Sequence, residues 1–167
     1  MINFCTRCGA GVSLEIPAGD TLPRHVCKRC GHIHYENPRL VVGCVAEWQG
    51  CILLCWRASE PQRVLWTLPA GFMELGETTA QGAARETDEE AGTEYEMGNL
   101  FSVLSVVRVG QVHLFYLARL LSERFDPGHE TLEARLFTEQ EIPWDEIAFR
   151  TVRETLLRYF EDRRKGH

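Results

Sequence analysis

The sequence contains no apolar run of the length that a membrane-spanning helix needs, about 20 residues. Its first residues, MINFCTRCG, also lack the apolar stretch of a secretory signal, so we expect a cytoplasmic protein with no membrane partner. Basic residues are in deficit, since 18 Lys and Arg stand against 24 Asp and Glu, for a formal net charge of -6. This deficit argues against a general nucleic-acid surface. It also means that an anionic substrate would need metal ions or local arginines to approach.

Low-complexity tracts are absent, and the only internal repeat is a pair of short cysteine motifs near the start. A chain of 167 residues with 44% hydrophobic content can form one ordinary domain core and a small appendage. We therefore divide the chain into a small segment at residues 1–36 and a larger domain at residues 37–167.

The acidic residues are concentrated near the end of one predicted helix, at Glu86, Glu89 and Glu90. Acids are unfavourable at a helix C-terminus, and like charges three or four residues apart repel by roughly 0.2 to 0.5 kcal/mol. Glu86 and Glu90 are separated by about 40° around the helix axis, so their oxygens can converge on one point. A charged surface helix is the alternative, but residues 77–90 carry five acids and one base instead of alternating signs. The pattern favours a bound divalent cation.

The same helix has clear end signals. Thr78 is a typical N-cap, Gln81 completes a capping box, and Gly92 is a stop signal. Glycines in the preceding loop bring Glu77 beside the helix, and Arg85 lies next to the acids.

The stretch GFMELGETTAQGAARETDEEAGT resembles the Nudix box in every charged and glycine position. Both apolar positions of the signature hold threonine, Thr87 and Thr93, which affects packing and not metal chemistry. The resemblance implies an α/β/α sandwich with a mixed sheet, and hydrolysis of the phosphoanhydride in a nucleoside diphosphate derivative. The matching positions are Gly71, Glu77, Arg85, Glu86, Glu89, Glu90 and Gly92.

The resemblance also implies roles for these residues. Glu86, Glu89 and Glu90, together with the Gly71 carbonyl, would hold Mg²⁺ or Mn²⁺ against the pyrophosphate. Within the motif, Glu90 is the nearest candidate for the general base, Glu77 would support it, and Arg85 would orient the acids. Some Nudix enzymes take the base from a later loop, which here offers Glu130 or Glu133.

Two CxxC knuckles, Cys5 with Cys8 and Cys27 with Cys30, are separated by 18 residues. This spacing is typical of structural zinc, which four thiolates enclose with no open coordination position. Disulfides are the alternative, but seven cysteines is an odd number. The histidines that could replace a cysteine as ligands are His25, His32 and His34. The remaining cysteines, which we interpret as reduced core thiols, are Cys44, Cys51 and Cys55.

A four-cysteine ribbon before a Nudix domain is similar to two groups, the NADH pyrophosphatases and the FAD or ADP-ribose pyrophosphatases. The second group matches better, through segments such as CGHIHYENPRLVVGCV and LWTLPAGFMELGE. The first group also carries a SQPWPFP-type sequence after the box, which this chain lacks. The resemblance implies a small-molecule nucleotide substrate, FAD or ADP-ribose, release of AMP, and a possible homodimer. Alternatives in the same class are NADH pyrophosphatase and nucleoside triphosphate pyrophosphohydrolase.

Two further alternatives belong to other classes. A degenerate, nucleotide-sensing Nudix domain is disfavoured by the intact acids. An RNA-binding ribbon on a decapping hydrolase is disfavoured because residues 1–37 carry four Lys or Arg against three Asp or Glu. Nucleic-acid binding is therefore not expected.

Alternating apolar residues predict strands at 39–48 and 51–57, joined in a hairpin at Gln49-Gly50. Further strands are expected at 65–71, 100–109, 111–120 and 133–138, and a terminal helix at 148–164. Several aromatic side chains could stack on an adenine, although aromatics in such strands more often belong to the core. These are Trp48, Trp56, Trp66, Phe72, Phe101, Tyr116 and Trp144.

Overall fold

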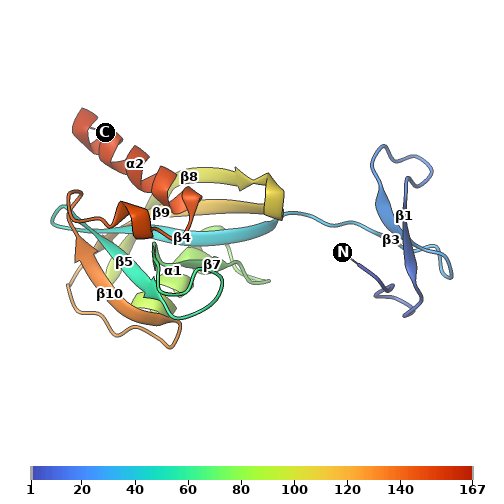
Figure 1. Cartoon of the computed structure of the whole chain (residues 1–167), viewed down its shortest axis with the longest axis horizontal. Helices are drawn as coiled ribbons and strands as arrows, with labels where there is room; N and C mark the ends of the chain where they lie inside the picture. The colour runs from blue at the N-terminus through green and yellow to red at the C-terminus, as the bar shows by residue number, and fades with distance from the viewer. Residues whose placement is uncertain (1, 167) are drawn as a thin grey trace. The chain divides into compact units, whose positions relative to one another are not determined.

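The computed structural model describes residues 2–166, which form two compact units, one ending at Asn37 and one beginning at Pro38. The first unit is a three-stranded antiparallel ribbon in the order β1-β2-β3 (Figure 1). Its strands are β1 (Val12–Glu15), β2 (Arg24–Cys27) and β3 (Ile33–His34). Among residues 2–166, no helix combines the length and the apolar character that a membrane span requires.

The second unit is a seven-stranded sheet with two α-helices. Its strands are β4 (Arg39–Trp48), β5 (Cys51–Arg57), β6 (Trp66–Thr67), β7 (Ala70–Phe72), β8 (Tyr95–Val106), β9 (Gln111–Leu120) and β10 (Thr131–Phe137). Its helices are α1 (Thr79–Ala91) and α2 (Arg150–Lys165), with short 3-10 turns η1 (Val107–Val109) and η2 (Trp144–Glu146).

The sheet is mixed. Its main path runs β10-β5-β4-β9-β8, β6 pairs with β5, and β7 pairs with β4. Strand β4 runs parallel to β9 over nine residue pairs, whereas the other pairings are antiparallel. The mixed sheet and its two helices confirm the predicted fold class.

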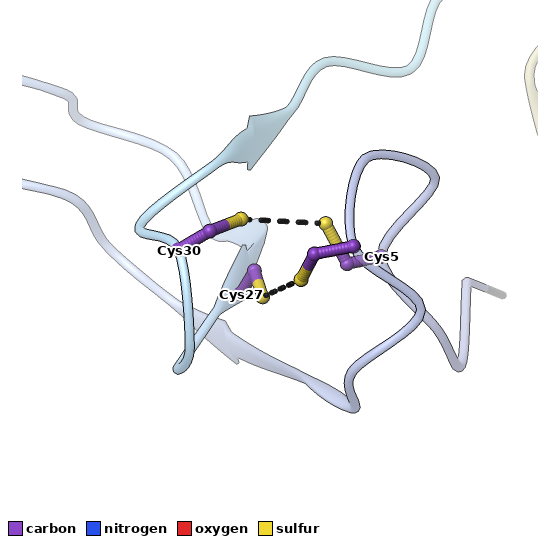
Figure 2. Close-up of side chains that lie close together, drawn as sticks. Cys5, Cys27 and Cys30 are labelled. Atoms are coloured by element: carbon purple, nitrogen blue, oxygen red, sulfur yellow. Dashed lines mark hydrogen bonds between the residues drawn. The ribbon is translucent and has the colours of Figure 1, made fainter.

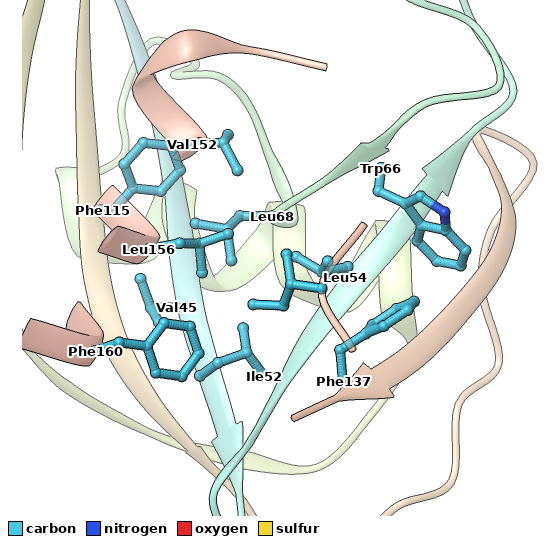
Figure 3. Packing of buried hydrophobic residues seen from close by; sticks show 11 residues of the cluster. Val45, Ile52, Leu54, Trp66, Leu68, Phe115, Phe137, Val152, Leu156 and Phe160 are labelled. Carbon is cyan, nitrogen blue, oxygen red and sulfur yellow. The ribbon is translucent and has the colours of Figure 1, made fainter. Parts of the chain in front are cut away.

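Side-chain alternation along β4 and β5 divides the core between the two faces of the sheet. On one face, Val45, Ile52 and Leu54 pack with Leu156 and Phe160 of α2 (Figure 3). On the other face, smaller residues such as Cys44 and Cys55 pack with Ala83 and Ala91 of α1. These small side chains let α1 lie close to the sheet, and this close packing positions the acids of the helix.

The predicted ends of α1 are confirmed. The Thr78 side chain accepts a hydrogen bond from the Gln81 N–H, the Gln81 side-chain oxygen accepts one from the Thr78 N–H at 2.8 Å, and Gly92 ends the helix at φ 55°. The predicted hairpin at Gln49-Gly50 is also confirmed, with both residues at positive φ, 45° and 91°. Such values suit the tight turns that match the twist of two paired strands.

The prediction for β8 was too short and shifted. The strand begins at Tyr95, five residues before the predicted start, and residues 107–109 form η1 instead of continuing the strand. The segment around Gly98 and Asn99 contains weak strand formers, so its apolar pattern is faint. Irregular pairing with β9, between Met97 and Ser102, accommodates this segment in the sheet.

Candidate active site and cysteine cluster

The Arg85 guanidinium contacts three of the predicted acids. It contacts Glu77 through two nitrogens at 2.9 and 3.1 Å, and Nη1 contacts Glu86 at 2.7 Å and Glu89 at 3.2 Å. Its Nη2 also donates to the Phe72 carbonyl at 3.0 Å. Hydrogen bonding to Arg85 lowers the pKa of Glu77. One arginine therefore orients the acidic residues but cannot neutralise all their charge.

Glu86 points toward the backbone of Gly71 and is only 9% exposed. A Cβ on Gly71 would overlap the Glu86 carboxylate, so this position must be glycine for the carboxylate to lie where it does. Burial raises the pKa of Glu86, and the hydrogen bond from Arg85 opposes the rise. The sequence signal for this contact is the glycine at position 71.

Glu90 is the most buried acid of the three, at 6% exposure. Its Oε2 accepts a hydrogen bond from the Ala70 N–H at 3.0 Å, which fixes the carboxylate against β7. Burial raises the pKa of Glu90 to about 8, and the negative charge of Glu86 adds to the effect. The site thus holds two buried carboxylates whose charges are unfavourable without a further cation.

Another close approach involves a glycine that the sequence analysis did not single out. A Cβ on Gly82 of α1 would lie 2.6 Å from Oε1 of Glu77. The same Glu77 oxygen accepts the Glu74 N–H at 2.6 Å, so the loop before α1 closes on this carboxylate. Only the spacing of Gly82 from Glu77 could have signalled the contact.

The two later acids proposed as the base lie in different places. Glu133 of β10 is exposed, and its pairing with Trp56 puts it on the face of the sheet opposite α1. Glu130 precedes β10. Burial is the main cause of the raised pKa values of Glu86 and Glu90, and the negative charge of Glu130 adds to the rise in both. The structure therefore brings Glu130, and not Glu133, toward the acids of α1.

Replacing Gly71 with alanine is expected to lower hydrolysis by the order of 10²-fold, because misplacing a reacting group by about 1 Å can have that effect. The new Cβ would displace the end of the flexible Glu86 side chain, so the free energy of unfolding should fall by only about 1 kcal/mol. Steady-state kinetics across a Mn²⁺ series, with urea unfolding, measures both. Gly11→Ala is the control, because a Cβ there meets open space. Wild-type kinetics in Gly71→Ala would contradict the expectation.

The four knuckle cysteines converge in the ribbon (Figure 2). Cys5 Sγ lies 3.7 Å from Cys30 Sγ, and Cys8 Sγ lies 3.5 Å from Cys27 Sγ. These separations are far longer than the 2.05 Å of a disulfide bond. Tetrahedral zinc with Zn–S bonds of about 2.3 Å would separate its sulfurs by about 3.8 Å. The cluster therefore has the dimensions of a zinc site.

Backbone geometry prepares the cluster for a cation. Each knuckle ends in a glycine at positive φ, Gly9 at 71° and Gly31 at 70°, whose N–H donates to the carbonyl of the first cysteine of its knuckle. Backbone hydrogen bonding from Cys30 lowers the pKa of the Cys27 thiol to about 6, whereas the pKa of its partner Cys8 is raised to about 11, because a backbone hydrogen bond from Ala10 that lowers it is outweighed by the hydrogen bond with Cys27 and burial together. Without a metal, Cys27 is therefore the thiolate of this pair and Cys8 holds the proton. Among residues 2–166, these cysteines are the only group of three or more His, Cys, Asp or Glu found in an arrangement that could hold a metal ion, and their sulfur atoms all lie within 4.8 Å of one another.

The other cysteines and the ribbon histidines lie outside this cluster. Cys44 and Cys55 are buried against α1, and burial raises the pKa of both thiols, as expected of core residues. Cys51 is half-buried in β5. His25 contacts Glu36 at 2.9 Å and His34 is buried.

Comparison with known proteins gives two family matches. Residues 3–36 match a zinc-ribbon family described as Nudix N-terminal, and residues 37–160 match the NUDIX domain. A crystal structure of a NUDIX hydrolase from Nitrosomonas europaea has a TM-score of 0.94 and 53% identity, covering 99% of this chain and 94% of that chain.

The relatives found among curated proteins have lower sequence identity to this chain. The chain is 30% identical over 146 residues to the NAD-capped RNA hydrolase NudC of Photobacterium profundum, covering 84% of this chain and 52% of that protein. It is 27% identical over 113 residues to an ADP-ribose pyrophosphatase of Methanocaldococcus jannaschii, covering 65% and 67% respectively. The chain thus spans about half to two thirds of the length of these relatives.

Proposed function

Because this chain belongs to the Nudix family, as a hydrolase with an N-terminal zinc ribbon, we propose that it cleaves the phosphoanhydride of a nucleoside diphosphate linked to another group. The observation that carries the proposal is the acidic row on α1, in which Glu86 and Glu90 are buried side chains one helical turn apart. Burying two carboxylates at this spacing is unfavourable unless a cation joins them. A diphosphate substrate is the ligand that such cations would bind.

Nudix enzymes use divalent metal ions, and the donor set here fits hard cations. We propose that Glu86, Glu89 and Glu90 hold Mg²⁺ or Mn²⁺, together with the Gly71 carbonyl. When bound, such ions neutralise negative charge on phosphate oxygens and lower the pKa of water.

The chain's own residues then hold the reacting groups in place. Glu90 is the proposed proton acceptor for the attacking water, and the Ala70 N–H holds one of its oxygens at 3.0 Å. Arg85 orients Glu86 and Glu89, and Glu77 holds Arg85 through two hydrogen bonds. These contacts keep the carboxylates in position before substrate arrives.

For the substrate, we propose ADP-ribose or FAD, either of which would release AMP. The name of the Methanocaldococcus relative and the resemblance of the sequence to the FAD and ADP-ribose group support this choice. A second candidate is a dinucleotide of the NAD type, because several relatives are named NAD-capped RNA hydrolase. The missing SQPWPFP-type sequence weighs against it.

A substrate panel tests these choices. The purified full chain is incubated with Mg²⁺ or Mn²⁺ and with FAD, ADP-ribose, NADH, NAD, an NAD-capped RNA or several nucleoside triphosphates. The products are identified by chromatography. We expect AMP from ADP-ribose or FAD at the highest kcat/KM. Preferred cleavage of NADH or the capped RNA would favour the second candidate, and pyrophosphate released from triphosphates would contradict both.

A further inference from the structure

We propose that Gly128 is a positioning residue for the metal-binding acids of α1. This inference rests on the proposed function and adds a residue that lies outside the Nudix box, in the loop between β9 and β10. Its basis is a set of backbone hydrogen bonds from residues 126–128 of that loop, which we call the clasp, to the C-terminal end of α1.

The last carbonyls of α1 have no partner within the helix, as at any helix C-terminus. The clasp supplies donors for several of them. The Gly128 N–H donates to the Glu89 carbonyl at 3.0 Å. The Asp126 N–H is shared between the carbonyls of Ala91 and Gly92, at 3.0 and 3.2 Å. A loop that is distant in sequence therefore completes the end of the acidic helix.

The two remaining carbonyls at this end are paired as well. The Glu90 carbonyl accepts the S–H of Cys55 on β5, with Sγ 3.7 Å away, and the Asp88 carbonyl accepts the Gly92 N–H at 2.9 Å. Each carbonyl from residue 88 to residue 92 thus has a donor. Acids at a helix C-terminus face the negative end of the helix dipole, and N–H groups bound to the carbonyls offset that charge. The clasp therefore stabilises an arrangement that the helix alone disfavours.

Two glycines let the clasp approach α1 this closely. A Cβ on Gly128 would overlap the Glu89 carbonyl oxygen, and a Cβ on Gly92 would overlap the Asp126 carbonyl oxygen. Both neighbours are backbone atoms, which cannot move aside as the end of a flexible side chain can. The φ of Gly128 lies outside the left-handed region, so only the lack of space requires glycine there.

The clasp is itself held at both ends. Phe125, just before it, packs against the core cluster on the α1 face of the sheet. Just after it, the Thr131 N–H donates to the Gly128 carbonyl at 3.1 Å, and the Ala58 N–H donates to the Glu130 carbonyl at 2.9 Å. Because its ends are fixed to the sheet, the clasp holds the end of α1 at a set distance from the strands.

The backbone that Gly128 holds carries the least restrained acid of the row. The Glu89 side chain is 60% exposed, and among residues 2–166 its carboxylate has one hydrogen-bond partner, Arg85 at 3.2 Å. The place of this carboxylate therefore depends on where its backbone lies. Groups that orient metal ligands typically change the metal affinity by roughly 10- to 100-fold when they are altered.

The alternative role for the clasp is structural. A loop that only covers the helix end predicts that Gly128→Ala lowers the thermal stability and leaves the metal affinity of the folded protein unchanged. A positioning role predicts weaker metal binding at a temperature at which the variant is fully folded.

The experiment titrates Mn²⁺ into the full chain without substrate and measures the free ion by electron paramagnetic resonance. We expect Gly128→Ala to raise the Mn²⁺ Kd by roughly 10- to 100-fold. The Mn²⁺ concentration that gives half-maximal hydrolysis of ADP-ribose should rise by a similar factor. Gly11→Ala is the control for the added methyl group, because a Cβ there meets open space, and its Mn²⁺ Kd should equal that of the wild type.

A second measurement needs no variant. If the clasp favours metal binding, metal binding must stabilise the clasp by the same factor. We therefore expect saturating Mg²⁺ to slow the hydrogen exchange of the Gly128 and Asp126 amides in the wild type. The reference is the Gly110 amide, which donates to the Val107 carbonyl at 3.2 Å in the turn before β9 and should exchange at the same rate with and without Mg²⁺.

Two results would overturn the proposal. One is a wild-type Mn²⁺ Kd in Gly128→Ala, whether or not its melting temperature falls. The other, which decides the matter if Gly128→Ala does not fold, is equal exchange of the two clasp amides with and without Mg²⁺. A wild type that binds Mn²⁺ but cleaves no member of the substrate panel would refute the proposed function, and the Mn²⁺ titration would still test Gly128 separately.

Discussion

Replacing Glu90 with glutamine is expected to lower hydrolysis by roughly 10²- to 10⁴-fold, the usual contribution of a general base, while the fold is retained. Glutamine has nearly the same shape as glutamate, and its amide oxygen can still accept the hydrogen bond from the Ala70 N–H. What it lacks is the negative charge that would bind a cation and the basicity that would let it accept a proton. Steady-state kinetics with the preferred substrate measures the loss.

In EDTA, the difference in stability between Glu90→Gln and the wild type is expected to depend on pH. Burial raises the pKa of Glu90 from its ordinary value of 4.5 to about 8, so the folded state binds the proton more tightly than the unfolded state does. The wild type therefore loses stability as the pH rises from about 4.5 to about 8, and glutamine has no charge to lose. We expect Glu90→Gln to melt above the wild type at pH 8 and close to it at pH 4.5.

Glu94→Gln is the matched control, because Glu94 is exposed and follows α1 without contacting the acidic row. Its turnover and melting temperature should equal those of the wild type. Full turnover in Glu90→Gln would exclude Glu90 as the proton acceptor, and a Glu90→Gln protein that does not fold would show that the carboxylate is structural.

The acidic helix could be predicted from the sequence because its signals are local. Thr78 and Gln81 fix its start, Gly92 fixes its end, and the 3.6-residue repeat then determines which acids share a face. Gly71 also lies close in sequence, within the same loop. The family was identified from the same short stretch, and the family matches confirm it.

The residues outside this stretch that lie near the acids of α1 could not be predicted in the same way. Whether Glu133 faces α1 depends on the register of β10, and the irregular pairing between Thr131 and Glu133 changes which side chains share a face. The contact of Cys55 on β5 with the Glu90 carbonyl of α1 likewise depends on how the strands of the sheet are ordered beneath the helix. The parallel pairing of β4 with β9 likewise leaves no local signal, and only the family resemblance implied a mixed sheet.

Replacing Cys27 with serine is expected to remove most bound zinc and to unfold the ribbon. Among residues 2–37, the only buried side chains are Cys5, Cys27 and His34, so the ribbon has almost no apolar core of its own. Its larger apolar residues are exposed, including Phe4 at 68% and Leu14 at 65%. The stability of such a unit comes from metal binding, worth about 10 to 16 kcal/mol in zinc-finger peptides.

Elemental analysis of the purified protein should give one zinc per chain in the wild type and much less in Cys27→Ser, because a serine hydroxyl does not ionise to supply the fourth anionic ligand. Limited proteolysis should then cleave the variant within the ribbon first. Cys51→Ser is the control, since this thiol is half-buried in β5 and lies outside the cluster, so zinc content should not change. Full zinc occupancy in Cys27→Ser would contradict the four-cysteine ligand set. Because the acids of α1 belong to the other unit, this result would leave the proposed hydrolysis untouched.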